Sequence, residues 1–333
     1  MAVRLQYRIG LALLWAASLL GGEPYELGNG IRLDNGMNVG GYFSSEFESG
    51  KQSDTVTLDD LAVMAYGEIN PAVSYLAELE SVGFYRKNLT DGTEEGDRKI
   101  HIERLYGDFR INDSFNLRIG KQITPIGYWN LEPINVLRDT SSNPLYATLL
   151  FPRFLTGIDI YGYLPGTEET TYHLFGQATH DLDDEYINIP NTHFYGFAVD
   201  KEFSVQTSGG GSIGEYIEQS SNERTRFVQG QVRFDDGEWK LTAEGMVAKT
   251  DYASGTADYT TAGYAQMLYR FNPQHAVVGR YEYFDRRKDG YTDNIGIIGY
   301  SYRPLYPVSL KGEYQWHSIS DENRFLCSFS VLF

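Results

Sequence analysis

The sequence has 333 residues, of which 41% are hydrophobic, 14% aromatic and 22% charged, and its formal net charge is −17. The mean hydropathy of −0.38 and the shortness of the main apolar run, Ile9 to Leu20, exclude a bundle of membrane-spanning helices, each of which needs about 20 apolar residues. The acidic balance also argues against binding of nucleic acid, which requires a basic surface. A membrane barrel is not excluded, because its strands alternate apolar and polar residues.

The N-terminus predicts a secretory signal peptide over residues 1–22. Arg4 and Arg8 precede the apolar run, which leads into small residues at positions 16–18 and 21–22; this is the order of a cleavable signal. The alternative is a buried N-terminal helix. We expect residues 23–333 to form one exported domain, in which the single cysteine, Cys327, cannot form an internal disulfide.

Alternating residues on both sides of short turns predict β-hairpins along the whole exported chain. The clearest example runs over 226–234 and 239–247, joined by the turn 235–238, because period-two alternation around an Asp/Gly turn is typical of a hairpin. Further hairpins are predicted over 58–82, 105–121, 156–179, 193–212, 263–283 and 294–316, with single strands over 39–48 and 324–333. The predicted fold is therefore all-β: a 16-stranded antiparallel transmembrane β-barrel with short turns on one side and longer loops on the other.

The last predicted strand favours a membrane location. Phe325, Cys327, Phe329, Val331 and Phe333 form one apolar face. This strand resembles the C-terminal strand of bacterial outer-membrane proteins, in which a terminal aromatic belongs to the assembly signal. The alternative is aromatic packing across the strands of a soluble sheet.

The longest predicted connection, 123–155, lies between the fifth and sixth strands. It contains four prolines, Trp129, Glu132, Arg138, Asp139 and Arg153, and it is too apolar for a solvated loop. A loop of this length with its own apolar residues is functional or packed against something. We expect it to fold toward the lumen as a constriction; packing over the rim or against a neighbouring subunit is the alternative.

The segment Arg118-Ile-Gly-Lys-Gln-Ile-Thr-Pro-Ile-Gly-Tyr-Trp-Asn130 resembles the passage from strand to third loop in bacterial outer-membrane porins of the general diffusion and phosphate-selective groups. The resemblance implies a homotrimeric passive channel in the outer membrane of a Gram-negative bacterium, in contact with lipid and lipopolysaccharide, whose third loop forms the constriction. The resemblance does not indicate which solutes pass through the channel.

Alternation also assigns charged side chains to the lumen, because a charge facing lipid at mid-depth costs about 2–4 kcal/mol for Arg or Lys. The predicted pore-lining and constriction residues are Glu46, Glu78, Arg104, Asp108, Arg110, Arg118, Glu132, Arg138, Asp139, Arg153, Arg270, Arg280 and Lys311, with Glu48, Glu80, Glu282 and Glu313 beside them. Basic and acidic residues on different walls would create a transverse field. The alternative is that these charges only solvate the wall.

A barrel of this width leaves an aqueous channel, so we predict passive diffusion of ions and small hydrophilic solutes, with a slight preference for cations. We expect no enzyme, since no Ser/His grouping suits catalysis, and no cofactor or metal, since no histidines have zinc-type spacing. The alternatives are a channel selective for an anion such as phosphate and a non-conducting structural or adhesive barrel.

Overall fold

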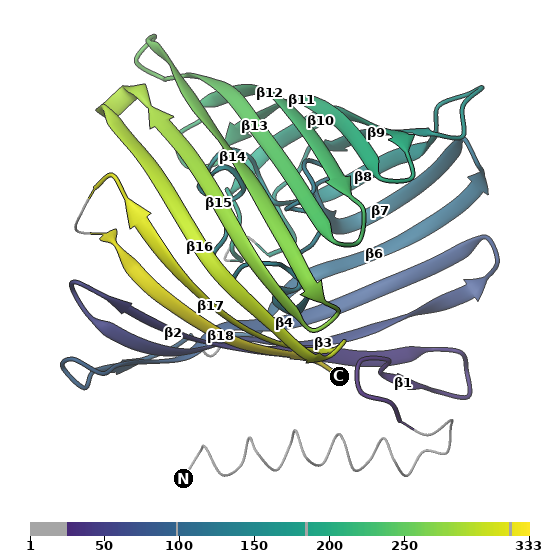
Figure 1. Cartoon of the computed structure of the whole chain (residues 1–333). Coiled ribbons are helices and arrows are strands. Elements are labelled where there is room, and N and C mark those ends of the chain that lie inside the picture. Colours follow the sequence, from purple (N-terminus) through teal and green to yellow (C-terminus); the bar gives the residue numbers. More distant parts are fainter. Residues whose placement is uncertain (1–24, 98, 184–185, 320–321) are drawn as a thin grey trace.

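The computed structural model describes residues 25–97, 99–183, 186–319 and 322–333, and the predicted signal peptide lies outside them. The described chain forms one antiparallel sheet that curves round until its last long strand pairs with its first (Figure 1). The long strands are β2 (Asn38–Gly50), β3 (Asp54–Asn70), β4 (Val73–Asn88), β6 (His101–Asn112), β7 (Phe115–Ile123), β8 (Phe154–Tyr163), β9 (Thr170–Gln177), β10 (Asn191–Ser204), β11 (Thr207–Glu218), β12 (Arg224–Asp235), β13 (Trp239–Asp251), β14 (Ala257–Asn272), β15 (His275–Arg286), β16 (Tyr291–Leu305), β17 (Val308–His317) and β18 (Arg324–Leu332).

The remaining elements are short. They are β1 (Ile31–Arg32), β5 (Glu94–Glu95), the 3₁₀ turns η1 (Asn135–Leu137) and η2 (Arg287–Asp289), and the helix α2 (Leu145–Leu149). β1 pairs with β2, and β5 pairs with the C-terminal end of β4. Within the described part of the chain, no helix is long and apolar enough to cross a membrane.

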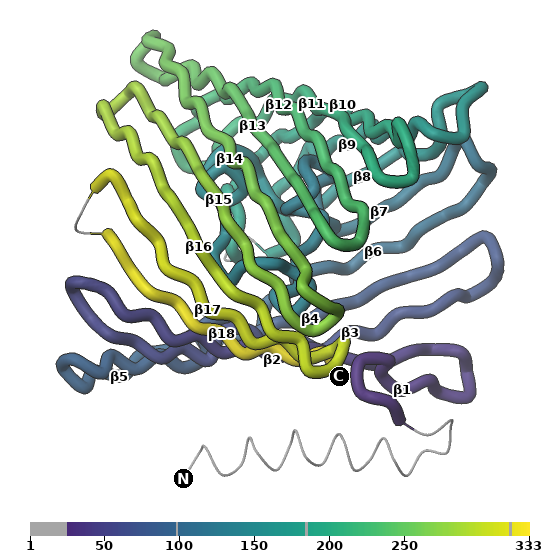
Figure 2. Tube along the Cα trace, viewed as in Figure 1, coloured from purple at the N-terminus to yellow at the C-terminus, as the bar shows by residue number. Residues whose placement is uncertain are grey.

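The predicted closed barrel of 16 antiparallel strands is confirmed. Each long strand pairs with the next along the chain, and β18 closes on β2 from Arg324 opposite Gly50 to Leu332 opposite Tyr42 (Figure 2). The turn of the hairpin predicted over 193–212, which the sequence Asp-Lys-Glu at 200–202 indicated, was misplaced. The chain does not turn at 200–202 but continues in β10 to Ser204, because Asp200 faces inward and accepts hydrogen bonds of 2.7 and 2.8 Å from the Gln231 amide.

The seam between the two ends of the sheet is completed by the last residue. Phe333 N–H donates to Gly41 O at 2.8 Å, and Gly41 N–H donates to Phe333 O at 2.7 Å. A Cβ at position 41 would lie 2.2 Å from Ala62 O and 2.8 Å from the Phe333 ring. Only glycine therefore fits where the final aromatic ring packs against the sheet.

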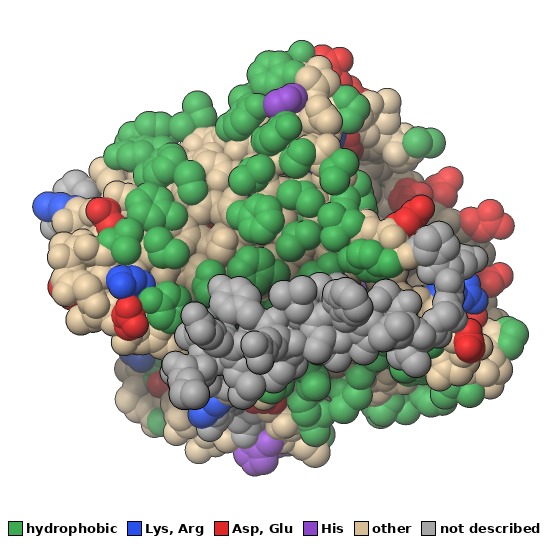
Figure 3. All heavy atoms as spheres, turned by 90° about the horizontal axis from the view of Figure 1, so that it is seen from below, with side chains coloured by type: hydrophobic (Ala, Val, Ile, Leu, Met, Phe, Trp, Pro, Cys, Tyr) green, Lys and Arg blue, Asp and Glu red, His purple; other side chains and the backbone are tan. Residues whose placement is uncertain are grey.

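Where strand pairing is regular, side chains alternate between the two faces of the sheet. In β13, Thr242, Glu244 and Met246 are buried inside, whereas Leu241 and Val247 are exposed on the outside. Figure 3 shows hydrophobic side chains gathered over the outer surface of the strands, with charged side chains toward its ends. Such an apolar outer band is the surface that a barrel presents to lipid.

Candidate functional site

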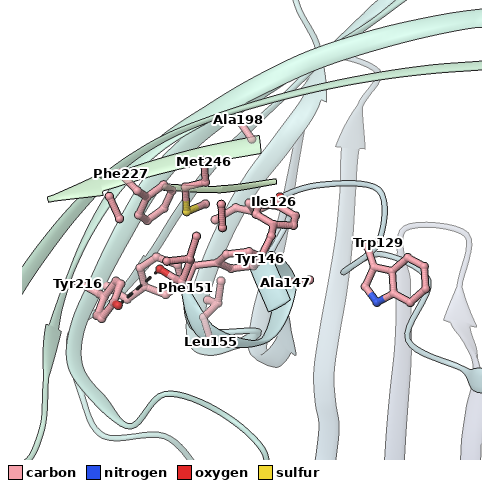
Figure 4. Close-up of a cluster of buried hydrophobic side chains, with 14 of the residues drawn as sticks. Ile126, Trp129, Tyr146, Ala147, Phe151, Leu155, Ala198, Tyr216, Phe227 and Met246 are labelled. Carbon is pink, nitrogen blue, oxygen red and sulfur yellow. Dashed lines mark hydrogen bonds between the residues drawn. The ribbon is translucent and has the colours of Figure 1, made fainter. Parts of the chain in front are cut away.

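The connection between β7 and β8, residues 124–153, lies inside the barrel against one part of the wall. Apolar side chains of this segment, among them Ile126, Tyr146 and Phe151, form a buried cluster with the inward-facing Phe227 and Met246 (Figure 4). Apolar burial of this kind stabilises by roughly 25 cal/mol per Å² removed from water. The segment is therefore packed like a core.

Three wall carboxylates hold the backbone of this inner loop, which we define as residues 124–153. Glu244 accepts from Tyr128 N at 3.0 Å and Trp129 N at 2.9 Å. Glu313 accepts from the N–H groups of residues 141 and 142 at 2.9 and 3.1 Å, and Glu282 accepts from the N–H of residue 145 at 2.9 Å. Because the loop has little regular structure of its own, these carboxylates satisfy N–H groups that would otherwise be unpaired.

Basic side chains of the same wall complete the attachment. Arg280 donates to Thr140 Oγ1 and to Ser142 Oγ, both at 2.6 Å, and Lys311 Nζ donates to Asn135 O at 2.5 Å. Arg280 is 3% exposed and Lys311 is 5% exposed. The prediction that these two residues line the pore needs correction: they face inward as expected, but the loop covers them and uses them as anchors.

The acidic side chains of the inner loop are also paired with the wall. Glu132 lies 2.8 Å from Arg233, and Asp139 lies 3.0 Å from Lys240. Both carboxylates are thus neutralised where the loop meets β12 and β13, and they do not supply free negative charge to the lumen.

The opposite wall, formed by β2, β3, β4 and β6, is acidic. Glu46, Glu48, Asp59, Asp60, Glu80 and Glu103 line a cavity of about 380 Å³ between this wall and the inner loop. Tyr42 Oη donates to Glu103 at 2.7 Å and to Glu80 at 3.1 Å, and Ser44 Oγ donates to Asp60 at 2.7 Å. We call these six carboxylates the acidic wall.

On the loop side, the same cavity is lined by Arg138 and Arg153. Arg138 Nε donates to Glu132 O and Nη1 donates to Asn143 Oδ1, both at 2.7 Å, and its guanidinium lies 5.3 Å from the centre of the Trp129 ring. Burial, followed by repulsion from Arg153, lowers the pKa of Arg138 to about 10, so the group keeps its positive charge at neutral pH. Among the described residues, neither arginine has a carboxylate within 4.0 Å.

The other predicted residues form ion pairs along the inner wall. Arg104 pairs with Glu78, and Arg118 lies 2.6 Å from Asp108 and 4.5 Å from the centre of the Tyr106 ring. Close to the short turns, the half-exposed Arg110 pairs with Glu68, and Arg270 lies 2.8 Å from Asp235. The structure therefore brings Glu46, Arg138 and Arg153 together at the cavity, and places these pairs elsewhere in the lumen.

Sequence alternation missed several functional side chains. Asp59, Asp60 and Glu103 lie beside irregularities in strand pairing, where an extra residue lets two neighbouring side chains share one face. Bulges leave no signal in a period-two pattern. Glu244 did lie on the polar face of the strand predicted over 239–247, and an isolated charge at such a position was the signal that could have identified it as a loop anchor.

No family model and no curated protein matches this sequence. Solved structures with the same fold include an anion-selective porin from Comamonas acidovorans, with a TM-score of 0.64, 9% identity and coverage of 89% of this chain and 99% of that one. The trimer form of OmpT, an outer-membrane protein of Vibrio cholerae, has a TM-score of 0.62 and 11% identity over 89% and 99%. The outer-membrane channel DcaP of Acinetobacter baumannii has a TM-score of 0.60 and 10% identity over 91% and 99%.

The class that these structures define is the bacterial outer-membrane porin barrel, and this chain has that fold. Identities of 9–11% establish the architecture alone, so the activity has to be argued from the site itself.

Proposed function

We propose that the protein is an outer-membrane channel through which ions and small hydrophilic solutes diffuse passively, without catalysis. The observation that carries this proposal is the cavity between the acidic wall and the inner loop, where Arg138 and Arg153 face carboxylates without pairing to them. Charged side chains left unpaired along an opening interact with passing ions, and rings of such charges set ion preference in pores.

The charge balance of this opening favours cations. Six carboxylates and Arg324 line one side, and two arginines line the other. Among the described residues, Glu48 is the only one of the six with a basic group within 4.0 Å, namely Arg324 at 3.6 Å. We therefore propose a cation preference, together with a field across the opening that orients dipolar solutes. The ion pairs Arg280–Glu282, Arg233–Glu132 and Lys240–Asp139 at the inner loop contribute little to it, because each is compensated locally.

We also propose that the chain forms homotrimers whose apolar outer band contacts lipid, with lipopolysaccharide around the loop end. The likeness to a protein with a trimer form supports this assembly, and the exposed hydrophobic belt supports the membrane location. Light scattering on detergent-solubilised protein distinguishes one copy from three.

The experiment is a planar-bilayer recording of the refolded chain. We expect stable stepwise conductance and a reversal potential in a KCl gradient that indicates cation preference. Gel mobility that changes on heating serves as the control for a closed barrel. A closed barrel that never conducts would refute the channel, and a reversal potential of the opposite sign would refute the cation preference alone.

A further inference from the structure

A second group of titratable side chains lies at the loop end of the barrel, away from the cavity. Asp293 on β16, His317 at the end of β17 and Glu322 in the connection to β18 bring one ligand atom each to within 4.8 Å of the others. His317 Nδ1 lies 2.7 Å from Asp293 Oδ2 and 3.7 Å from Glu322 Oε2. The side chains of Asp293 and His317 are 0% and 4% exposed, whereas Glu322 is 47% exposed.

Hydrogen bonds around His317 determine which ring nitrogen carries a proton. Gln315 Nε2 donates to Glu313 Oε1 at 2.8 Å, and Gln315 Oε1 accepts from Arg324 Nε at 2.8 Å, which together orient the amide. Since His317 Nε2 lies 3.3 Å from the same Gln315 Oε1, Nε2 must be the donor. Nδ1 faces the two carboxylates, and the proton shared across its 2.7 Å contact with Asp293 Oδ2 is the one that a metal ion would replace.

The groups around these three side chains are already arranged for a metal ion. Asp293 Oδ1 accepts from Ser318 N at 3.1 Å and from Ser318 Oγ at 2.8 Å, which leaves Oδ2 for the histidine side. A metal-bound histidine normally donates its other N–H to an oxygen that fixes the tautomer. Gln315 holds that position here.

We propose that Asp293, His317 and Glu322 bind a divalent transition-metal ion of the zinc class. One imidazole and two carboxylates suit Zn²⁺ and its neighbours, and the exposed side of Glu322 leaves a fourth position to water. Ligand atoms around a tetrahedral zinc ion with bonds of about 2.1 Å lie about 3.3 Å apart. Asp293 and His317 would therefore separate by roughly 0.6 Å, a shift within the reach of side-chain rotation.

The bound ion would join β16, β17 and the connection to β18 at the mouth of the barrel. It would also be linked to the inner loop, because Gln315 contacts Glu313, whose other oxygen accepts from the N–H of Ser141. Metal binding at this site does not require conduction or ion selectivity, so this proposal is independent of the proposed channel function.

The test is equilibrium dialysis of the chelator-treated, refolded full chain against Zn²⁺. We expect one Zn²⁺ per chain, loss of binding in His317→Gln and in Glu322→Gln, and binding weakened about 10- to 100-fold in Gln315→Leu. His173→Gln is the matched control, since His173 Nδ1 lies 2.8 Å from Asp159 Oδ2 in a histidine–aspartate pair outside this group; it should bind as the unmodified chain does.

X-ray absorption on the zinc-loaded protein should show one imidazole nitrogen with oxygen ligands. The proposal is overturned if the folded chain binds no Zn²⁺ at micromolar concentration, which would leave a protonated histidine between the carboxylates. It is equally overturned if His317→Gln and Glu322→Gln, each shown to be a closed barrel by heat-dependent gel mobility, still bind one ion.

Discussion

Replacement of Glu244 by alanine should release the inner loop from the barrel wall. Glu244 is 4% exposed and accepts from the N–H groups of Tyr128 and Trp129 at 3.0 and 2.9 Å, and from Tyr146 Oη at 3.2 Å. A buried donor that loses its acceptor costs about 1–3 kcal/mol. The two backbone donors alone therefore amount to about 2–6 kcal/mol.

Since each 1.4 kcal/mol is a factor of ten, the ratio of attached to detached loop should fall by between about one and four orders of magnitude. Two assays report this change. Single-channel recordings should show new flickering between conductance levels, and limited proteolysis should cut within residues 124–153, which are protected while the loop is packed.

Glu244→Gln should have a smaller effect, because the amide keeps one acceptor oxygen but turns an NH₂ toward the other N–H donor. Glu95→Ala is the control, since Glu95 is a largely exposed carboxylate on β5. The reasoning is refuted if Glu244→Ala shows no more flickering between conductance levels, and no more cleavage within residues 124–153, than Glu95→Ala.

Three further changes test other parts of the structure. Arg153→Glu alters the opening by two charge units, worth about 1.2 kcal/mol at ~7 Å in water, so we expect roughly sevenfold greater cation preference in reversal potentials. Gly41→Val should impair closure beside Phe333, at a cost of about 1–3 kcal/mol, seen as less folded barrel on unheated gels. Although burial acts in the opposite direction, hydrogen bonds from Ile102 N–H and His101 hold the pKa of Asp183 below its ordinary value. Asp183→Asn should therefore lower the free energy of unfolding by about 1 kcal/mol at pH 7. This difference should shrink as the pH falls below about 4 and vanish once the pH is below the lowered pKa of Asp183 in the folded chain.

The first two of these changes have a matched control. Arg153→Lys keeps the charge and should keep the selectivity. Gly230→Val adds the same side chain on β12, where a Cβ meets nothing within 4 Å, and should fold normally. A loss of stability in Asp183→Asn that does not shrink at all as the pH falls below about 4 would contradict the electrostatic origin given for it.

The sequence predicted the barrel well because a strand with one wet and one apolar face imposes a strict period of two. Glu46, Glu78 and Arg280 all face inward as that pattern requires. Alternation reports only the face of a sheet, however. It could not show that the inner loop covers Arg280, since that depends on contacts between residues more than a hundred positions apart.

The sequence also could not show which charged side chains surround the cavity. Asp59 and Glu103 join the acidic wall through irregular pairing, which a regular pattern assigns to the wrong face. Glu132 and Asp139 looked like constriction residues but are neutralised by Arg233 and Lys240. Only the folded chain shows which charges remain unpaired.

The most direct test of the channel is chemical modification of one residue on the acidic wall during a conductance recording. In a Cys327→Ser background, Glu46→Cys places the only thiol on the wall of the cavity, and Ser45→Cys places it on the outer face of the same strand. A bulky thiol reagent should reduce the single-channel conductance of the first variant in a single step and leave the second unchanged. Full labelling of Glu46→Cys, verified by mass, with no change in conductance would contradict the proposed route of solutes.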